Sequence, residues 1–244
     1  MRKEAEHRWY SSWFDTPYYH ILYKDRDKRE AQQFMDKLTK FLKLPNNAEI
    51  LDLACGRGRH SVYLNELGYH VIGADLSSEN IKYAKRFENE TLTFKQHDMC
   101  MPYPKKFDAV FNLFTSFGYF DTEEDNFRTI NAIKSELKKG GYGVIDFLNV
   151  EFVRENLVAN EIKHVDDITF HMEKEVSKDH IIKHITFDVD GRSQKFTEKV
   201  RALSLKDFME YFKEAKAELL YSFGDYNLTP FHPNSSERLI LIFN

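Results

Sequence analysis

The segment from Ile50 to His60 constrains the fold more than any other part of the sequence. An apolar stretch, Ile50-Leu51-Asp52-Leu53-Ala54, runs into the turn Cys55-Gly56-Arg57-Gly58, and a helix pattern begins at Arg59. Glycines in such a turn let the backbone approach a ligand that side chains would exclude. Free N–H groups at the start of the helix favour a negatively charged or carboxylate-bearing group. The segment therefore predicts a nucleotide-like cofactor at the end of a buried strand.

Strand and helix patterns alternate around this turn. Hydrophobic periodicity predicts strands at Glu49–Ala54, His70–Ala74, Leu92–Gln96, Phe107–Phe111 and Tyr142–Phe147. It predicts helices at Arg29–Leu44, Arg59–Leu67, Ser78–Phe87 and Glu123–Lys138, the last of them stopped by Gly140-Gly141. Such alternation predicts a parallel sheet with helices on both faces, because right-handed crossovers place each helix over the sheet.

The alternation stops after about residue 150. An inserted antiparallel sheet is predicted from stretches rich in β-formers at Ile168–Val176, His180–Val189 and Phe196–Ala202. A helix from Ser204 to about Ala215 and a pair of strands, Glu218–Gly224 and Arg238–Phe243, complete the chain. The length suits a single domain over residues 1–244. We expect it to comprise a helical lid segment (1–45), a cofactor-binding core (46–150), the inserted sheet (165–203) and the final helix and strands (204–244).

The second predicted strand ends in Gly73-Ala74-Asp75, which places a carboxylate where the ribose of a nucleotide-like cofactor lies. Together with Asp52-x-Ala54-x-Gly56-x-Gly58, this order resembles the class I S-adenosylmethionine-dependent methyltransferases, whose first motif reads roughly acid-x-Gly-x-Gly-x-Gly. Ala54 replaces the first glycine by another small residue. The resemblance implies a Rossmann-like three-layer sandwich of α/β class, with a mostly parallel seven-stranded sheet and an antiparallel last strand. It also implies S-adenosylmethionine as the cofactor.

The resemblance further assigns individual contacts. The turn would flank the methionine part of the cofactor, Asp75 would hold the ribose, and Asp98 would bind the adenine amino group with Met99 lining the ring. Asn112 and Leu113, after the fourth strand, would approach the methyl donor. The cofactor-binding residues implied in this way are Asp52, Ala54, Cys55, Gly56, Gly58, Asp75, Leu76, Asp98, Met99, Asn112 and Leu113.

An aromatic run near the N-terminus allows two interpretations. Its members are Trp9, Tyr10, Trp13, Phe14, Tyr18, Tyr19 and Tyr23. Such rings usually pack a core, but in many relatives an N-terminal segment closes over the cofactor. In that case Tyr23 and Arg26 would contact the cofactor, and Tyr19 and His20 would be candidate catalytic groups.

His232 is a third catalytic candidate, because a histidine is able to take a proton near neutral pH. It lies in a loop before the last strand, where acceptor-binding residues often sit. The alternative is an ordinary surface turn.

Several other kinds of site are disfavoured. A dinucleotide site of the Gly-x-Gly-x-x-Gly type requires glycine where Ser61 stands. Neither Cys55 nor Cys100 has a second cysteine at metal-ligand spacing, so no metal is expected. The formal net charge of -4 argues against a nucleic-acid partner. Because no apolar stretch approaches roughly 20 residues and no signal peptide is recognisable, we expect a cytoplasmic protein without a membrane partner.

The predicted function is in-line transfer of a methyl group from S-adenosylmethionine to a small-molecule acceptor. After the fourth strand, Asn112-Leu113-Phe114-Thr115 lacks the Asn/Asp-Pro-Pro-aromatic signature of many amino-group methylases of nucleic acids and proteins. Two alternatives stay open: a methyltransferase acting on RNA or protein, and a non-catalytic subunit that binds the cofactor and regulates a partner. The sequence leaves open the acceptor, its reacting atom (O, N, C or S), the use of a general base, and the choice between monomer and homodimer.

Overall fold

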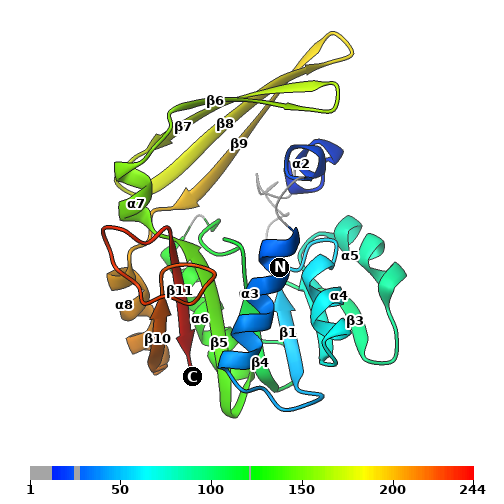
Figure 1. The fold of residues 1–244 in the computed structure, drawn as a ribbon, viewed down its shortest axis with the longest axis vertical. Helices are drawn as coiled ribbons and strands as arrows, with labels where there is room; N and C mark the ends of the chain where they lie inside the picture. The colour runs from blue at the N-terminus through cyan, green and yellow to red at the C-terminus, as the bar shows by residue number, and fades with distance from the viewer. Residues whose placement is uncertain (1–12, 25–27, 121) are drawn as a thin grey trace, which may run out of the picture.

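The computed structural model describes residues 13–24, 28–120 and 122–244 (Figure 1). A seven-stranded sheet forms its centre, in the strand order β10-β11-β5-β4-β1-β2-β3. The strands are β1 (Glu49–Leu53), β2 (His70–Asp75), β3 (Leu92–Gln96), β4 (Phe107–Asn112), β5 (Leu137–Leu148), β10 (Leu219–Phe223) and β11 (Arg238–Phe243). Neighbouring strands are parallel except at β11, which pairs antiparallel with both β5 and β10. The predicted fold class is confirmed.

Helices cover both faces of this sheet because each face carries its own apolar cluster. One cluster joins α6 (Glu123–Glu136) and α8 (Leu205–Ala215) to the sheet through residues such as Ile133 and Phe208. The other joins α3 (Lys28–Phe41), α4 (Arg59–Glu66) and α5 (Ser78–Ala84) through residues such as Phe34, Leu64 and Ile81. The remaining helices of this part are the 3-10 turn η1 (Lys85–Phe87) and α7 (Val150–Glu155).

The end of α6 differs from the prediction. The helix ends at Glu136, and Leu137 is already extended with ψ 137°. Gly140-Gly141 therefore does not stop the helix but lies inside β5, which pairs with β4 from Leu137 onward. The helical pattern misled the prediction because Lys138 and Lys139 are compatible with a helix surface, whereas strand pairing decides their conformation.

A separate four-stranded antiparallel sheet, here called the lid sheet, stands above the carboxyl ends of β1, β4 and β5 (Figure 1). Its strands are β6 (Asn160–Val165), β7 (Ile168–Val176), β8 (His180–Val189) and β9 (Arg192–Arg201). The sequence predicted three of these strands but missed β6, a mostly polar edge strand whose Ile162 is 60% exposed. It also began the last strand at Phe196, whereas pairing with β8 extends that strand back to Arg192.

The short helix α2 (Pro17–Leu22) packs against the lid sheet and not against the central one (Figure 1). Trp13 and Leu22 are buried with Val165, Phe170 and Ile185 in a third apolar cluster. The N-terminal aromatic residues in the described part, from Trp13 to Tyr23, therefore pack a core of their own. We call residues 13–24, which include α2, and the lid sheet together the cap.

None of the helices in the described ranges is long and apolar enough to cross a membrane. The cytoplasmic location and the choice between monomer and homodimer stay predictions.

Candidate active site

The carboxyl ends of β1 and β2 meet at the glycine turn. Beyond β1 the backbone is left-handed at Ala54 (φ 58°), Gly56 (φ 57°) and Gly58 (φ 80°). Gly58 donates its N–H to the carbonyl of Cys55 at 3.0 Å and forms the N-cap of α4 without a side-chain cap. The Cys55 thiol is buried, and burial raises its pKa. The turn therefore leaves backbone donors at the start of α4, as the sequence pattern predicted.

The ring of Phe94 explains two of the glycines. A Cβ atom on Gly58 would lie 2.5 Å from Phe94 Cε1, and one on Gly73 would lie 2.5 Å from Phe94 Cδ1. Phe94 is fully buried, so its ring is held between the two glycines. A Cβ atom on Gly56, by contrast, would meet no atom within 4 Å. Gly58 and Gly73 thus serve packing beneath the turn, while Gly56 borders open space.

Two carboxylates lie behind and beside the turn. Asp52 is buried and accepts a hydrogen bond from Ser61 Oγ at 2.6 Å, and burial raises its pKa to about 7. Asp75 accepts the N–H groups of Gly56 and Ser77, each at 2.8 Å. Burial also raises the pKa of Asp75. Asp75 therefore ties the end of β2 to the glycine turn, whereas Asp52 bonds inward to α4.

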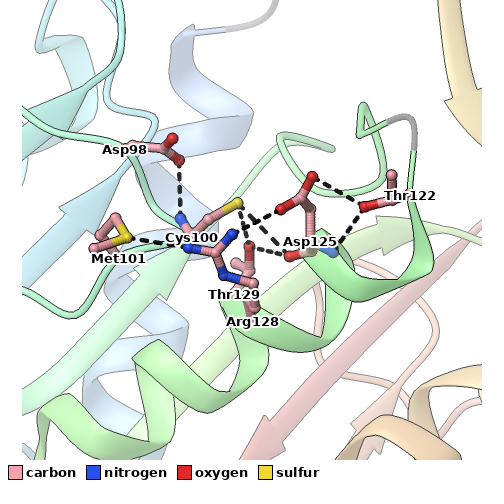
Figure 2. Close-up of polar contacts among 7 residues, drawn as sticks. All are labelled: Asp98, Cys100, Met101, Thr122, Asp125, Arg128 and Thr129. Atoms are coloured by element: carbon pink, nitrogen blue, oxygen red, sulfur yellow. Dashed lines mark hydrogen bonds and ion pairs between the residues drawn. The ribbon is translucent and has the colours of Figure 1, made fainter. Parts of the chain in front are cut away.

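The segment after β3 is fixed against α6. Figure 2 shows Asp98 accepting the N–H of Cys100, at 3.0 Å. The Cys100 thiol lies 3.4 Å from Thr129 Oγ1, and burial raises its pKa to about 12. Arg128 pairs with Asp125 at 3.3 Å in the same cluster (Figure 2). These contacts hold Asp98 at the side of the sheet formed by the carboxyl ends of the parallel strands, where Asp75 also lies. We call this side the cofactor edge.

The carboxyl end of β4 also lies at the cofactor edge. Asn112 is fully buried, and its Nδ2 donates to the Leu53 carbonyl at 3.3 Å and to Met99 Sδ at 3.5 Å. Its Oδ1 is buried with no hydrogen-bond partner among the described residues. Leu113 is buried next to it, and Leu76, after β2, is 38% exposed. The ends of β1, β3 and β4 therefore meet around one amide side chain.

The cap reaches this edge through His20. Burial is the main cause that lowers the pKa of His20 to about 4, and the positive charge of Arg57 in the glycine turn lowers it further. The ring is therefore neutral at pH 7. Its Nε2 is buried and has no hydrogen-bond partner in the described part of the chain. A second contact joins the Phe14 ring to the Tyr119 ring, with centroids 5.3 Å apart. The cap therefore lies near the glycine turn and contacts the segment after β4.

Tyr19 and Tyr23 lie within the cap. Tyr19 packs edge-on against the rings of Trp13 and Phe14. The Tyr23 hydroxyl donates to Glu198 Oε1 at 2.7 Å and accepts from Lys183 Nζ at 2.7 Å. These contacts join α2 to the lid sheet, so a role of Tyr23 in cofactor binding stays a prediction. Arg26, predicted to pair with the cofactor carboxylate, lies outside the described residues.

A groove of about 890 Å³ runs between α3 and the β10–β11 connection. Most of the residues that line it are polar or charged: Arg29, Glu30, Gln33, Lys37, Gly224, Asp225, Tyr226, Asn227, Thr229, Pro230, His232, Ser235, Ser236, Glu237 and Arg238. His232 is exposed in its wall. Tyr19 and His20 belong to the cap instead, so the structure does not bring the three catalytic candidates together.

Comparison with known proteins identifies the family. Residues 50–141 match the family model described as a methyltransferase domain. YqeM of Bacillus subtilis, named as a methyltransferase, is 28% identical over 84% of this chain and 87% of its own length. A crystal structure of an S-adenosylmethionine-dependent methyltransferase from Clostridium acetobutylicum superposes with a TM-score of 0.76 at 21% identity, covering 93% of this chain and 95% of that one. The chain belongs to the class I S-adenosylmethionine-dependent methyltransferases.

Another similar protein is the dTDP-3-amino-3,4,6-trideoxy-alpha-D-glucopyranose N,N-dimethyltransferase of Streptomyces venezuelae. It is 26% identical over 79% of this methyltransferase and 84% of its own length. The glycine/sarcosine N-methyltransferase of Aphanothece halophytica is 32% identical, but over only 54% of this chain and 51% of its own.

The cofactor of this methyltransferase is S-adenosylmethionine, and the residues present fit it. Asn112 Oδ1 and His20 Nε2 are buried polar atoms without a partner among the described residues. The amino, hydroxyl and adenine groups of the cofactor are able to satisfy such atoms. Gly56 adds open space beside backbone donors.

The prediction from sequence missed a polar cluster of this methyltransferase at the ends of β4, β5 and β11. Asp146, Thr115, Tyr226 and Arg238 are joined there by hydrogen bonds. One signal was available, because Asp146 interrupts an otherwise apolar predicted strand and a buried carboxylate requires partners. Its partners come from distant parts of the chain, so the sequence did not identify them.

Proposed function

We propose that the methyltransferase transfers the methyl group of S-adenosylmethionine to an amino group of a small polar molecule. This molecule binds in the groove between α3 and the β10–β11 connection. The groove carries this proposal. Its volume of about 890 Å³ lies within the range of small-molecule sites. Its lining offers hydroxyl, amide, carboxylate and cationic groups, which suits a hydroxylated molecule such as an amino sugar.

The groove adjoins the predicted cofactor edge through a chain of ring contacts. Tyr226 in the groove wall lies 5.6 Å from the ring of Phe114, centroid to centroid. Phe114 stacks on His60 at 4.2 Å, and His60 lies in the first turn of α4 directly after the glycine turn. These rings lead from the groove toward the turn expected to hold the methionine part, and we expect the acceptor nitrogen to meet the methyl group at the end of the groove next to Phe114.

The names of two relatives support an amine acceptor. One is named for N,N-dimethylation of an amino sugar nucleotide and another for N-methylation of glycine and sarcosine. Both acceptors named there are small and carry nitrogen. The net charge of -4 also argues against a nucleic-acid acceptor.

S-adenosylmethionine supplies a sulfonium methyl group, which transfers as the new N–C bond forms and the C–S bond breaks. We assign Asp75 to the ribose, Asp98 to the adenine amino group, and Asn112 and Leu113 to the methionine part. Alignment of acceptor nitrogen and methyl group, with exclusion of water by the cap, provides most of the acceleration.

Protonation of the acceptor decides whether it reacts. The groove is lined by three carboxylates (Glu30, Asp225 and Glu237) and three cationic side chains (Arg29, Lys37 and Arg238), so an ammonium group would be bound by close contact with one of the carboxylates and not by an overall negative charge. The ammonium must lose its proton before its nitrogen is able to attack. We assign this proton transfer to His232, the histidine of the groove wall.

The test is the conversion of S-adenosylmethionine to S-adenosylhomocysteine with a panel of amino sugars. Glucosamine and its N-acetyl derivative form a matched pair, because acetylation blocks the amino group and leaves the hydroxyl groups in place. We expect turnover with free amines only, and lower turnover in His232→Ala at unchanged cofactor affinity. Methylation of RNA or protein without methylation of any small amine would overturn the proposal.

A further inference from the structure

Asp146 is a fully buried carboxylate in β5, between the apolar residues Ile145 and Phe147. Burying a charge in an apolar strand is costly unless it is paired and hydrogen-bonded. Its neighbours therefore identify what the carboxylate holds in place.

The carboxylate accepts hydrogen bonds from two directions. Arg238 donates to Oδ1 through Nε at 2.9 Å and through Nη2 at 2.7 Å. On the other side, Oδ2 accepts the backbone N–H of Phe114 at 2.8 Å and the Tyr226 hydroxyl at 3.2 Å. The backbone carbonyl of Asp146 accepts the N–H of Thr115 at 3.0 Å. Asp146 thus accepts the backbone N–H groups of two consecutive residues in the segment after β4, Phe114 and Thr115.

That segment has an uncommon backbone. Phe114 (φ 58°) and Thr115 (φ 59°) are both left-handed, and they are the one pair of consecutive non-glycine residues with positive φ in the described ranges. A β-branched residue such as Thr115 is particularly unfavourable there. Backbone strain of this kind persists where surrounding groups hold it and is concentrated at functional sites.

The strained pair connects the two parts of the site. It follows Asn112 and Leu113 directly, and the Phe114 ring lies between His60 and Tyr226. Thr115 Oγ1 accepts from Arg238 Nη2 at 2.8 Å, and the side chain of Arg238 is 20% exposed at the groove. A shift of the pair would therefore move both the cofactor edge and the groove wall.

We propose that Asp146 is a positioning residue for methyl transfer. It holds Phe114 and Thr115 in the left-handed conformation, which fixes the end of β4 for cofactor binding and orients Arg238 at the groove. This role does not depend on which acceptor binds. A purely structural role, in which Asp146 only neutralises Arg238, leads to different expectations.

Asp146→Asn separates the two roles. An amide offers one oxygen, and the guanidinium of Arg238 attracts it more strongly than a neutral N–H does. Phe114 then loses its acceptor, and the strained pair relaxes. Thr115→Gly removes much of the need for that acceptor, because glycine adopts a left-handed conformation without strain. Loss of charge pairing alone would not be repaired by glycine at position 115.

The experiment is calorimetric titration of S-adenosylmethionine and S-adenosylhomocysteine into the wild type, Asp146→Asn, Thr115→Gly and the double variant. We expect Asp146→Asn to weaken binding at least five-fold in the wild-type background and at most two-fold in the Thr115→Gly background. Asp108→Asn is the matched control, because it loses a 2.8 Å ion pair with Lys138 outside the site and should bind as the wild type does.

Equal affinities for Asp146→Asn and Asp108→Asn would overturn the proposal, and so would the same loss in both Thr115 backgrounds. If Asp146→Asn fails to fold, Thr115→Gly is compared with Thr115→Val. Both lose the bond from Arg238, but only valine keeps the backbone strain. We then expect glycine to bind the cofactor at least five-fold more tightly than valine, and equal binding would refute the role of the left-handed pair.

Discussion

Replacement of Gly58 by alanine tests how the glycine turn is built. Alanine at this position must adopt φ 80° and place a Cβ atom 2.5 Å from Phe94 Cε1 and 3.2 Å from Ala84 Cβ. The buried Phe94 ring is unable to retreat freely, because Gly73 borders it on another side. Relief therefore requires movement of the turn or of the ring.

The magnitude follows from two separable costs. A left-handed alanine costs about 1–2 kcal/mol, and the lower entropy of its unfolded chain offsets about 0.4–1 kcal/mol of this. Overpacking of a buried ring adds about 1–3 kcal/mol. Gly191→Ala at the tip of the β8–β9 hairpin is the control, because Gly191 has φ 70° but no atom within 4 Å of its Cβ position. The overpacking term should therefore appear in Gly58→Ala alone.

The assay is thermal unfolding combined with titration of S-adenosylmethionine. An excess destabilisation of about 2 kcal/mol lowers the melting temperature by roughly 4–8 °C for a chain of this size. Gly58→Ala should melt that far below Gly191→Ala and lose cofactor affinity, and a second change, Phe94→Leu, should recover part of the stability. Equal melting temperatures for the two alanine variants would refute the packing explanation.

Three further predictions concern carboxylates. Asp75→Ala should weaken binding of S-adenosylmethionine more than ten-fold in calorimetry, since charged hydrogen bonds contribute about 1.5–3 kcal/mol; unchanged affinity would remove Asp75 from the site. Burial raises the pKa of Glu136 to about 7, so its contribution to stability is complete below pH 4.5 and disappears as the pH rises through 7. Glu136→Gln should therefore melt with less pH dependence than the wild type between pH 5 and 8, and parallel curves would contradict this. Burial opposes ionisation of Glu198, but the charge and hydrogen bond of Lys183, together with the hydrogen bonds from Trp13 and Tyr23, outweigh it and lower the pKa. Glu198→Gln should increase hydrogen exchange in α2 at pH 7, and this difference should vanish as the pH falls below the lowered pKa of the wild-type carboxylate.

The elements predicted correctly share one property, which is that their signals are local. The strand, turn and helix from Glu49 to Glu66 are encoded by an apolar run, glycines with left-handed backbone and helical periodicity, all within a few turns of chain. The parallel order of the sheet follows because short crossovers leave few alternatives. The predicted cofactor residues at the strand ends, such as Asp75 and Asp98, therefore come to one edge.

Other features depend on which strands meet. β6 lacks an apolar pattern, and pairing with β7 alone defines it. The aromatic residues near the N-terminus gave no sign that they would pack on a sheet more than a hundred residues away, where Trp13 donates to Glu198 at 2.8 Å. His232 and His20 were both candidates for catalysis in the sequence, but one lies in the groove and the other is in the cap, close enough to Arg57 for its charge to lower the pKa.

The sequence by itself determined the fold class and the turn expected to bind a cofactor, because both depend on short-range periodicity or on the conformational freedom of glycine. The resemblance of its motifs to the class I methyltransferases implied which cofactor that is. Tertiary structure decided the groove, the cap and the hydrogen-bond partners of Asp146. Arg238 and Asp146 are 92 residues apart in the chain and meet only because β11 pairs antiparallel with β5. A buried carboxylate requires partners, but only the register of the sheet selects them, and no pattern along one strand encodes that register.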